Sequence, residues 1–276
     1  MKFVYLIPIY YSMKRRILKS WREGKSKVET LVDANIPLIE MSPIFLAGLI
    51  FMFVVGYSFI KIIWMTVILV LSYIASQSIY EIGYLINDNI ASKKEGKKGR
   101  NVFKEYLPIW KVTALSIERL IIYLITILLL LRMGVNTKYI TGYVTITSIM
   151  FGIFLIYNLV TPKTRVFFFF FPLRLSKFVV FFYPITLIRY ITPDDILPYA
   201  IAITVRSTIK YTLRKIPETE ISVQLHLYEV FTQLLILSLL TTSVLAVLGN
   251  ITIDFQIILA VVVLVYILMF RVLKRV

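Results

Sequence analysis

Long apolar stretches separated by short polar segments dominate the sequence. A helix that crosses a bilayer needs about 20 consecutive, mostly apolar residues, and eight stretches meet or approach that length. The pattern therefore predicts an all-α polytopic membrane protein with about eight transmembrane helices, eight or nine in all. The expected spans are 36–58, 62–86, 112–131, 139–160, 167–190, 196–211, 223–247 and 252–270.

The fifth expected span has an alternative. Pro172, Arg174 and Lys177 interrupt its apolar run. A helix lying at the membrane surface, leading into a span that starts near Phe178, is compatible with the same pattern.

Residues 1–35 differ from the rest of the chain and predict a basic cytosolic or interfacial arm. Their basic residues follow the first apolar residues, the reverse of the order in a cleaved signal peptide. No internal repeat and no separate soluble domain is visible. We therefore expect one transmembrane domain over 36–276.

Composition supports a membrane protein, and charge predicts its orientation. The chain is 59% hydrophobic with a mean hydropathy of +0.82. Of its 31 Lys and Arg residues, 26 fall in segments that face one side if the N-terminus is cytoplasmic. Cytoplasmic loops are enriched in Lys and Arg, so we expect both termini inside. Topology then explains the net charge of +16 without a nucleic-acid partner.

The chain has no cysteine and one histidine, His226. Disulfides, thiolate metal sites and cysteine nucleophiles are therefore excluded. Any metal would take oxygen ligands, which favours magnesium, manganese or calcium.

The second span carries a polar stripe formed by Gln77, Glu81, Tyr84 and Asp88, at intervals of four, three and four. This spacing places the four side chains on one helix face. A carboxylate inside a span costs at least ~2.5 kcal/mol, so the stripe must face a cavity or another helix. Glu81 either lines a site or pairs with a basic residue such as Arg119.

Asn87, Asp88 and Glu95 form a candidate magnesium site just beyond this span. Magnesium binds few carboxylates, keeps several waters and bridges to substrate phosphates. A basic cluster surrounds Glu95 and is expected to bind phosphate, although a solvated loop has the same composition. Its members are Lys93, Lys94, Lys97, Lys98 and Arg100.

The segment 83–88, Gly-Tyr-Leu-Ile-Asn-Asp, resembles the first acidic motif of the UbiA superfamily of intramembrane prenyltransferases. That motif reads Asn-Asp-x-x-Asp-x-x-x-Asp at the cytoplasmic end of the second span. Asn87 and Asp88 match, Glu95 replaces the last aspartate, and Ala91 stands where the family has the middle one. The resemblance implies a bundle of about nine helices around a lipid-accessible cavity that opens to the cytoplasm.

The family's second acidic motif has no counterpart after the sixth span, where Glu218 and Glu220 are the nearest acids. Arg206, Lys210 and Arg214 instead form a basic stripe that is expected to bind substrate phosphate. The order of residues in this loop, Arg…Lys-Tyr…Pro-Glu, loosely resembles that of one branch of the family. Members of that branch transfer phosphoribosyl groups to polyprenyl phosphate. The resemblance thus implies a diphosphate donor, an isoprenoid or polyprenyl-phosphate lipid, and Mg²⁺ held by Asn87, Asp88, Glu95 and, as a further candidate, Glu218. Asp88, Glu95 and Glu81 are the catalytic candidates.

In the seventh span, His226 and Glu229 belong to a second polar stripe. They either line the cavity and orient the acceptor or hydrogen-bond two helices together. The pair Glu118 and Arg119 is expected to be structural.

Two other functions fit the sequence. The missing acids at position 91 and in the 206–220 loop suit a non-catalytic protein that binds a lipid phosphate or serves as a scaffold. Buried charges also occur in transporters, but no inverted repeat or broken helix pair supports that function here. Oligomeric state is not indicated by the sequence.

Overall fold

The computed structural model describes residues 42–91, 106–160 and 169–213 continuously. It also describes positions 11, 13–15, 17, 18, 93, 255, 258, 259 and 261–265. All regular structure in these residues is helical, as predicted. Within them, four helical segments are long and apolar enough to cross a membrane: Phe59–Ala91, Ile109–Arg132, Thr137–Leu159 and Phe170–Leu187.

The chain forms two compact units, which we describe separately. The first comprises Met1–Ile39 and Val67–Arg165, and the second comprises Glu40–Thr66 and Val166–Val276. Helix α3 (Phe59–Ile86) begins in the second unit and continues into the first. The single domain expected over 36–276 remains a prediction.

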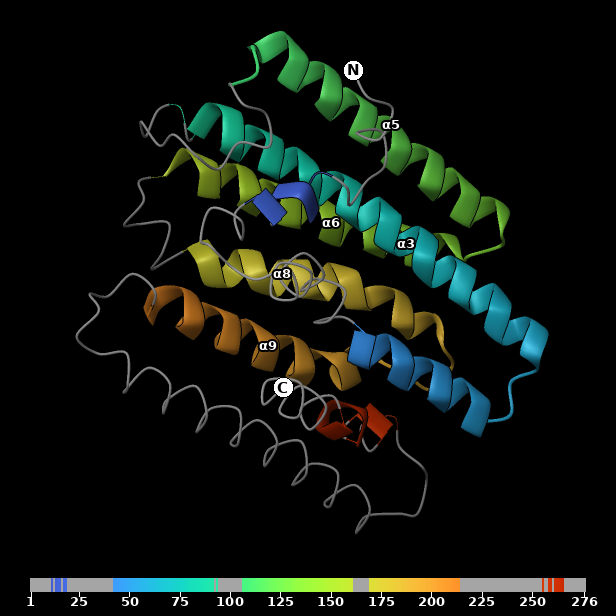
Figure 1. Cartoon of the computed structure of the whole chain (residues 1–276). Helices are drawn as coiled ribbons and strands as arrows, with labels where there is room; N and C mark the ends of the chain where they lie inside the picture. The colour runs from blue at the N-terminus through green and yellow to red at the C-terminus, as the bar shows by residue number, and fades with distance from the viewer. Residues whose placement is uncertain are drawn as a thin grey trace. The chain divides into compact units, whose positions relative to one another are not determined.

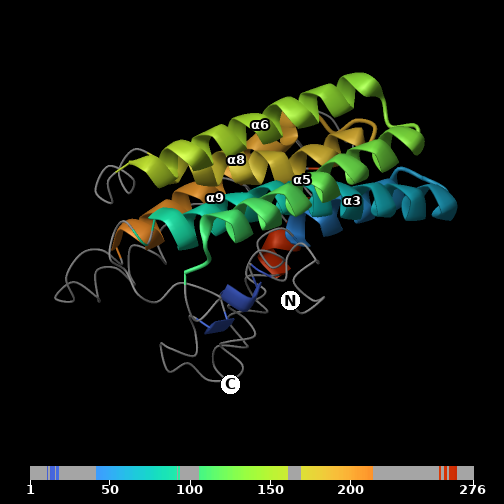
Figure 2. The same cartoon turned by 90° about the horizontal axis from the view of Figure 1, so that it is seen from above.

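The first unit packs α3 against α5 (Ile109–Arg132) and α6 (Thr137–Leu159). The second contains the short Ser42–Val54 helix, α8 (Phe170–Phe182), the 3₁₀ turn η4 (Tyr183–Leu187) and α9 (Pro193–Leu213). Figures 1 and 2 show α8 and α9 side by side, with α9 running back along α8.

Local residue chemistry sets the helix ends. Gly56 and Gly134 have φ values of 83° and 80°, a left-handed conformation that glycine adopts without the cost of a Cβ. The N–H of the residue after each glycine donates to a carbonyl in the last turn of the helix. Tyr57 donates to Met52 and Val135 donates to Leu130, as in a Schellman cap. The Asn136 side chain then caps α6 by accepting a bond from the Lys138 N–H.

The observed helices refine the predicted spans. The third, fourth and sixth spans correspond to α5, α6 and α9, with ends within three residues of the expected ones. The fifth is a continuous helix from Phe170 that tightens into η4 at Pro184, because proline lacks the N–H that an α-helix needs. The first span is shorter among the described residues, at Ser42–Val54. The seventh lies outside them, and the eighth is described only at scattered positions.

The first unit buries several polar side chains among its apolar core and exposes many large aliphatic ones. Large aliphatic side chains such as Leu120, Leu124 and Leu128 of α5 are exposed, whereas Ser72, Ser76 and Gln77 of α3 are buried. The Tyr143 hydroxyl donates to the Ser72 carbonyl at 2.5 Å and also contacts the Ser76 hydroxyl. Hydrogen bonds across helices satisfy polar groups where lipid offers no partner.

Gly83 lets α6 approach α3 closely. A Cβ at this position would overlap the Phe154 ring. One turn further along α6, the Asn158 amide donates to the Gly83 carbonyl at 3.1 Å. The glycine of the predicted motif therefore positions α6 beside the end of α3.

Candidate functional site at the end of helix α3

The second predicted span continues past its expected end at residue 86. A π-helical turn, η2 (Asn87–Ala91), keeps Asn87, Asp88 and Asn89 buried. Such turns often occur at functional sites. The motif expected just beyond the helix therefore belongs to its last turn and lies inside the first unit.

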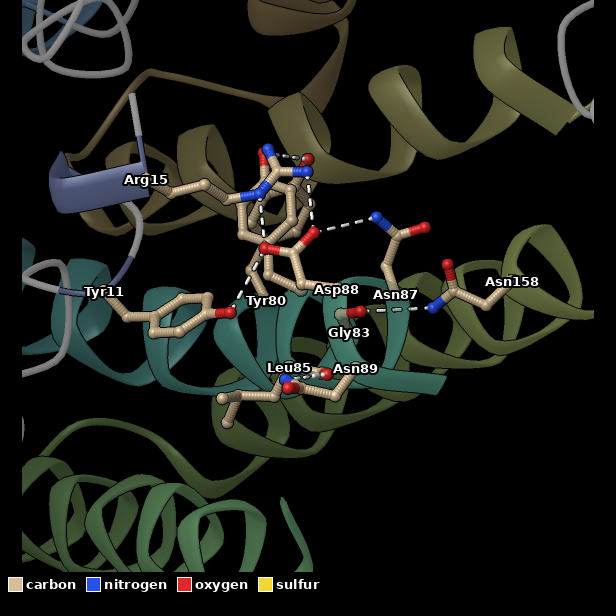
Figure 3. Close-up of polar contacts among 10 residues, drawn as sticks. Tyr11, Arg15, Tyr80, Gly83, Leu85, Asn87, Asp88, Asn89 and Asn158 are labelled. Carbon is tan, nitrogen blue, oxygen red and sulfur yellow. Dashed lines mark hydrogen bonds and ion pairs between the residues drawn. The ribbon is translucent and has the colours of Figure 1, made fainter. Parts of the chain in front are cut away.

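The Asp88 carboxylate is fully buried and accepts four hydrogen bonds, two on each oxygen. Figure 3 shows Arg15 and Tyr11 converging on it from the N-terminal arm. Arg15 donates from Nε to Oδ2 at 2.6 Å and from Nη2 to Oδ1 at 2.9 Å. Tyr11 donates to Oδ2 and the Asn87 amide donates to Oδ1, each at 3.1 Å. An ionised carboxylate has about four acceptor positions, so the coordination of Asp88 is complete.

Packing holds this part of the arm against the α3 end. Tyr11 and Arg15 are four residues apart in a short helical stretch, so both reach the same face. Tyr11 is buried in an apolar cluster with Leu85, Val112 and Leu115. The Arg15 guanidinium lies 4.5 Å from the centre of the Tyr84 ring, within the range of a cation–π contact.

Charge at the site is fixed. Burial lowers the pKa of Arg15, but the Asp88 carboxylate outweighs this and raises that pKa above its ordinary value. Burial, followed by the charge of Asp88, raises the pKa of Tyr11 well above its usual range. Arg15 is therefore permanently cationic, and Tyr11 is a neutral hydrogen-bond donor.

Two asparagines tie the site to the neighbouring helices. The Asn89 amide donates to the Leu85 carbonyl at 2.9 Å, and its oxygen accepts from the Leu107 N–H at 2.9 Å, just before α5. Asn158 anchors α6 at Gly83. Sequence reasoning missed both residues, although each is an amide at the polar end of a predicted span.

Glu81 pairs with Arg119, the structural alternative left open by the sequence. The Arg119 Nε donates to Glu81 at 2.8 Å, and its Nη1 donates to Glu118 at 2.7 Å. Glu81 and Arg119 are both buried, and their ion pair joins α3 to α5. Of the expected cavity residues, Gln77 is buried, and the Tyr84 ring contacts those of Tyr80 and Phe154. The cavity itself remains a prediction.

The structure locates only part of the predicted site. Lys93 is exposed. Arg206 and Lys210 belong to the α9 backbone, in the second unit, and their side chains are not among the described ones. The remaining expected residues lie outside the described part of the chain: Lys94, Glu95, Lys97, Lys98, Arg100, Arg214, Glu218, Glu220, His226 and Glu229.

As arranged, the described ligands do not fit magnesium. No group of three metal-binding side chains occurs among the residues that the structure describes. Asp88 already has four donors, one of them a guanidinium whose charge would repel a cation. Magnesium at Asp88 would therefore require Arg15 and Tyr11 to move away, and the predicted site with Glu95 remains a prediction.

Comparison with protein-family models, curated proteins and solved structures finds no match to this chain. The resemblance to the UbiA superfamily therefore rests on the sequence alone, through its motif and its predicted spans.

The geometry suits an anion site. Asp88 uses two of the five N–H groups of Arg15, which leaves three further donors on a guanidinium held in place. A guanidinium in fixed geometry binds phosphate through paired hydrogen bonds. Whether these donors bind a phosphate remains a prediction.

Proposed function

We propose that this protein is a membrane-embedded transferase of the UbiA type. It moves a prenyl or phosphoribosyl group from a diphosphate donor and uses a membrane lipid such as a polyprenyl phosphate as one substrate. The reaction takes place at the cytoplasmic end of α3, in a multi-pass protein with both termini in the cytoplasm.

One observation carries the proposal. Asp88, at the position of the superfamily's first acidic motif, is buried and holds the Arg15 guanidinium in bidentate geometry. A buried charge pair at the end of a membrane helix is costly to maintain. Its presence is explained if the guanidinium receives a phosphate.

The proposed reaction depends on charge stabilisation. The bond between the donor carbon and the diphosphate oxygen breaks, and the diphosphate leaves with the electron pair. When polyprenyl phosphate is the acceptor, its ionised phosphate oxygen forms the new bond to carbon, and no proton has to be removed. Arg15 binds the developing negative charge, and Asp88 positions Arg15. Lys93, Lys94, Lys97 and Arg100 are the further phosphate-binding candidates.

The first prediction concerns Asp88→Asn. Without the carboxylate charge Arg15 loses its anchor, so we expect transfer to fall by roughly 100-fold. Product formation by purified full-length protein is measured with labelled prenyl diphosphate and with phosphoribosyl diphosphate, together with kcat and KM. Lys138→Gln, at the exposed start of α6, is the control and should match wild type. Wild-type turnover by a folded Asp88→Asn variant would contradict the assignment.

A second candidate is a protein that binds the lipid phosphate without turnover. The four donors on Asp88 favour it, because they leave no open metal position, and Ala91 removes one expected ligand. The same assay separates the two functions. A wild-type protein that binds the labelled donor and releases no product, with either donor and with magnesium added, supports the non-catalytic function.

A further inference from the structure

The chain supplies its own cation to the carboxylate at the end of α3. Arg15 donates from Nε and Nη2 to the two oxygens of Asp88, at 2.6 and 2.9 Å. Both carboxylate oxygens thus face one guanidinium, as Figure 3 shows. The guanidinium therefore occupies the position that a cation bridging these two oxygens would take.

The neighbouring positions of the predicted metal site are arranged for this pair. The Asn87 side chain turns its nitrogen toward Asp88 and donates at 3.1 Å, so its oxygen points away from the carboxylate (Figure 3). Ala91, in the same π-helical turn, has only a methyl group. Magnesium requires oxygen ligands that converge on one point. Asn87, Asp88 and Ala91 offer no such convergence.

Two further contacts hold Arg15 in place. Its guanidinium lies 4.5 Å from the centre of the Tyr84 ring. Tyr11, one helical turn earlier in the arm, is buried beside Leu85 and donates to the same carboxylate. An arginine side chain stays protonated at every physiological pH. A divalent ion at Asp88 would therefore be repelled by a fixed positive charge.

One edge of the guanidinium is directed away from Asp88. The Arg15 side chain is 18% exposed, whereas that of Asp88 is fully buried. Two of the five N–H groups bond the carboxylate, and the other three belong to Nη1 and Nη2. An edge formed by two guanidinium nitrogens matches two oxygens of a phosphate. Magnesium usually joins a protein carboxylate to a substrate phosphate, and this guanidinium has the donors for the same connection.

We propose that Arg15 takes the place of a divalent metal, so that the end of α3 binds a diphosphate without a metal ion. Asp88 anchors the cation, and the outward edge of Arg15 bonds the phosphate oxygens. The inference rests on the proposed transferase function, which supplies the diphosphate ligand. It deepens that function by assigning the role expected of Mg²⁺ to a residue of the N-terminal arm.

The first test compares diphosphate binding with and without metal. Inorganic diphosphate, the group that both candidate donors share, is titrated into purified full-length protein in neutral detergent. Calorimetry gives the Kd in EDTA and in magnesium, with free and magnesium-bound diphosphate counted separately. We expect binding in EDTA to be at least as tight as binding in magnesium.

A second measurement detects the metal directly and does not depend on activity. Mn²⁺ is titrated into the protein without diphosphate, and electron paramagnetic resonance measures the bound fraction. Because Asp88 holds a guanidinium, we expect wild type and Asp88→Asn to bind Mn²⁺ equally. Mn²⁺ binding that is present in wild type and lost in Asp88→Asn would overturn the inference.

Matched variants locate the bound diphosphate. Arg15→Gln should weaken binding in EDTA by about tenfold or more, because charge-assisted hydrogen bonds are lost. Arg132→Gln removes the same charge from an exposed position in the last turn of α5 and should bind like wild type. If Arg15→Gln does not fold, Arg15→Lys replaces it. That variant keeps the charge without the two-edged geometry, so binding should weaken by about threefold or more.

The outcomes separate this inference from the proposed function. Diphosphate binding that requires magnesium overturns the inference and leaves the transferase function standing, and equal weakening by Arg15→Gln and Arg132→Gln overturns it as a response to net charge. Metal-free binding that depends on Arg15, without product from either labelled donor, supports the inference and rejects transfer. An absence of binding in both conditions overturns both.

Discussion

At the scale of residues, the buried end of helix α3 depends on one carboxylate and its cationic partner. Asp88 was identifiable from the sequence, because it ends a predicted polar helix face. Arg15 was not, since it is one of eight basic residues in the arm and lies 73 positions away. Only the fold brings them together.

The Arg15–Asp88 pair should be strongly coupled in stability. Arg15→Gln leaves a buried carboxylate without its cation, so we expect the free energy of unfolding to fall by about 3 kcal/mol. Adding Asp88→Asn should recover part of this loss, because the uncompensated charge is then removed. Chemical unfolding of both single variants and the double variant in detergent measures the coupling. Strictly additive effects would show that the two side chains do not interact.

At the scale of elements, helix α3 organises the first unit. Its residues Ser72, Ser76, Gln77 and Glu81 are buried, and so is Asp88 in the π-helical turn that follows. The period of the polar positions predicted that Gln77, Glu81 and Asp88 share a face. The sequence did not show that the helix would continue as a π-helical turn through Ala91, because that turn depends on partners for three buried polar side chains.

The contact between α3 and α6 should be sensitive to a single methyl group. Gly83→Ala places a Cβ inside the Phe154 ring, so we expect a loss of stability of about 1–3 kcal/mol. Gly152→Ala is the matched control in α6, because its Cβ would meet no atom within 4 Å. That variant should be neutral or slightly stabilising through helix propensity. The measurement is the free energy of unfolding in detergent.

A rescue tests the proposed cause. Phe154→Leu should restore part of the stability of Gly83→Ala by removing the ring that the new methyl group meets. If the double variant is no more stable than Gly83→Ala, the clash is not the origin of the loss.

At the scale of the whole molecule, four membrane-length helices among the described residues confirm an all-helical architecture suited to a membrane. The orientation rests on the distribution of Lys and Arg. The chain contains no cysteine, so single cysteines can be introduced without a background signal.

Orientation can be tested with Lys93→Cys and Lys138→Cys, both at exposed positions. We expect a membrane-impermeant maleimide to label Lys138→Cys in intact cells, because the α5–α6 turn is predicted to face outward. Lys93→Cys should be labelled only after the membrane is opened. The reverse pattern would place both termini outside and remove the proposed site from the cytoplasmic face.

The sequence by itself determined the helical class, the approximate ends of the third, fourth and sixth spans, and the shared face of Gln77, Glu81 and Asp88. These follow from local hydrophobicity and helical period, which are properties of short segments. The tertiary structure decided which side chains pair: Arg15 and Tyr11 with Asp88, Arg119 with Glu81, and Arg174 with Ser207. A period specifies the face on which a residue lies but carries no information about its partner, because the partner is chosen by packing between segments distant in the chain.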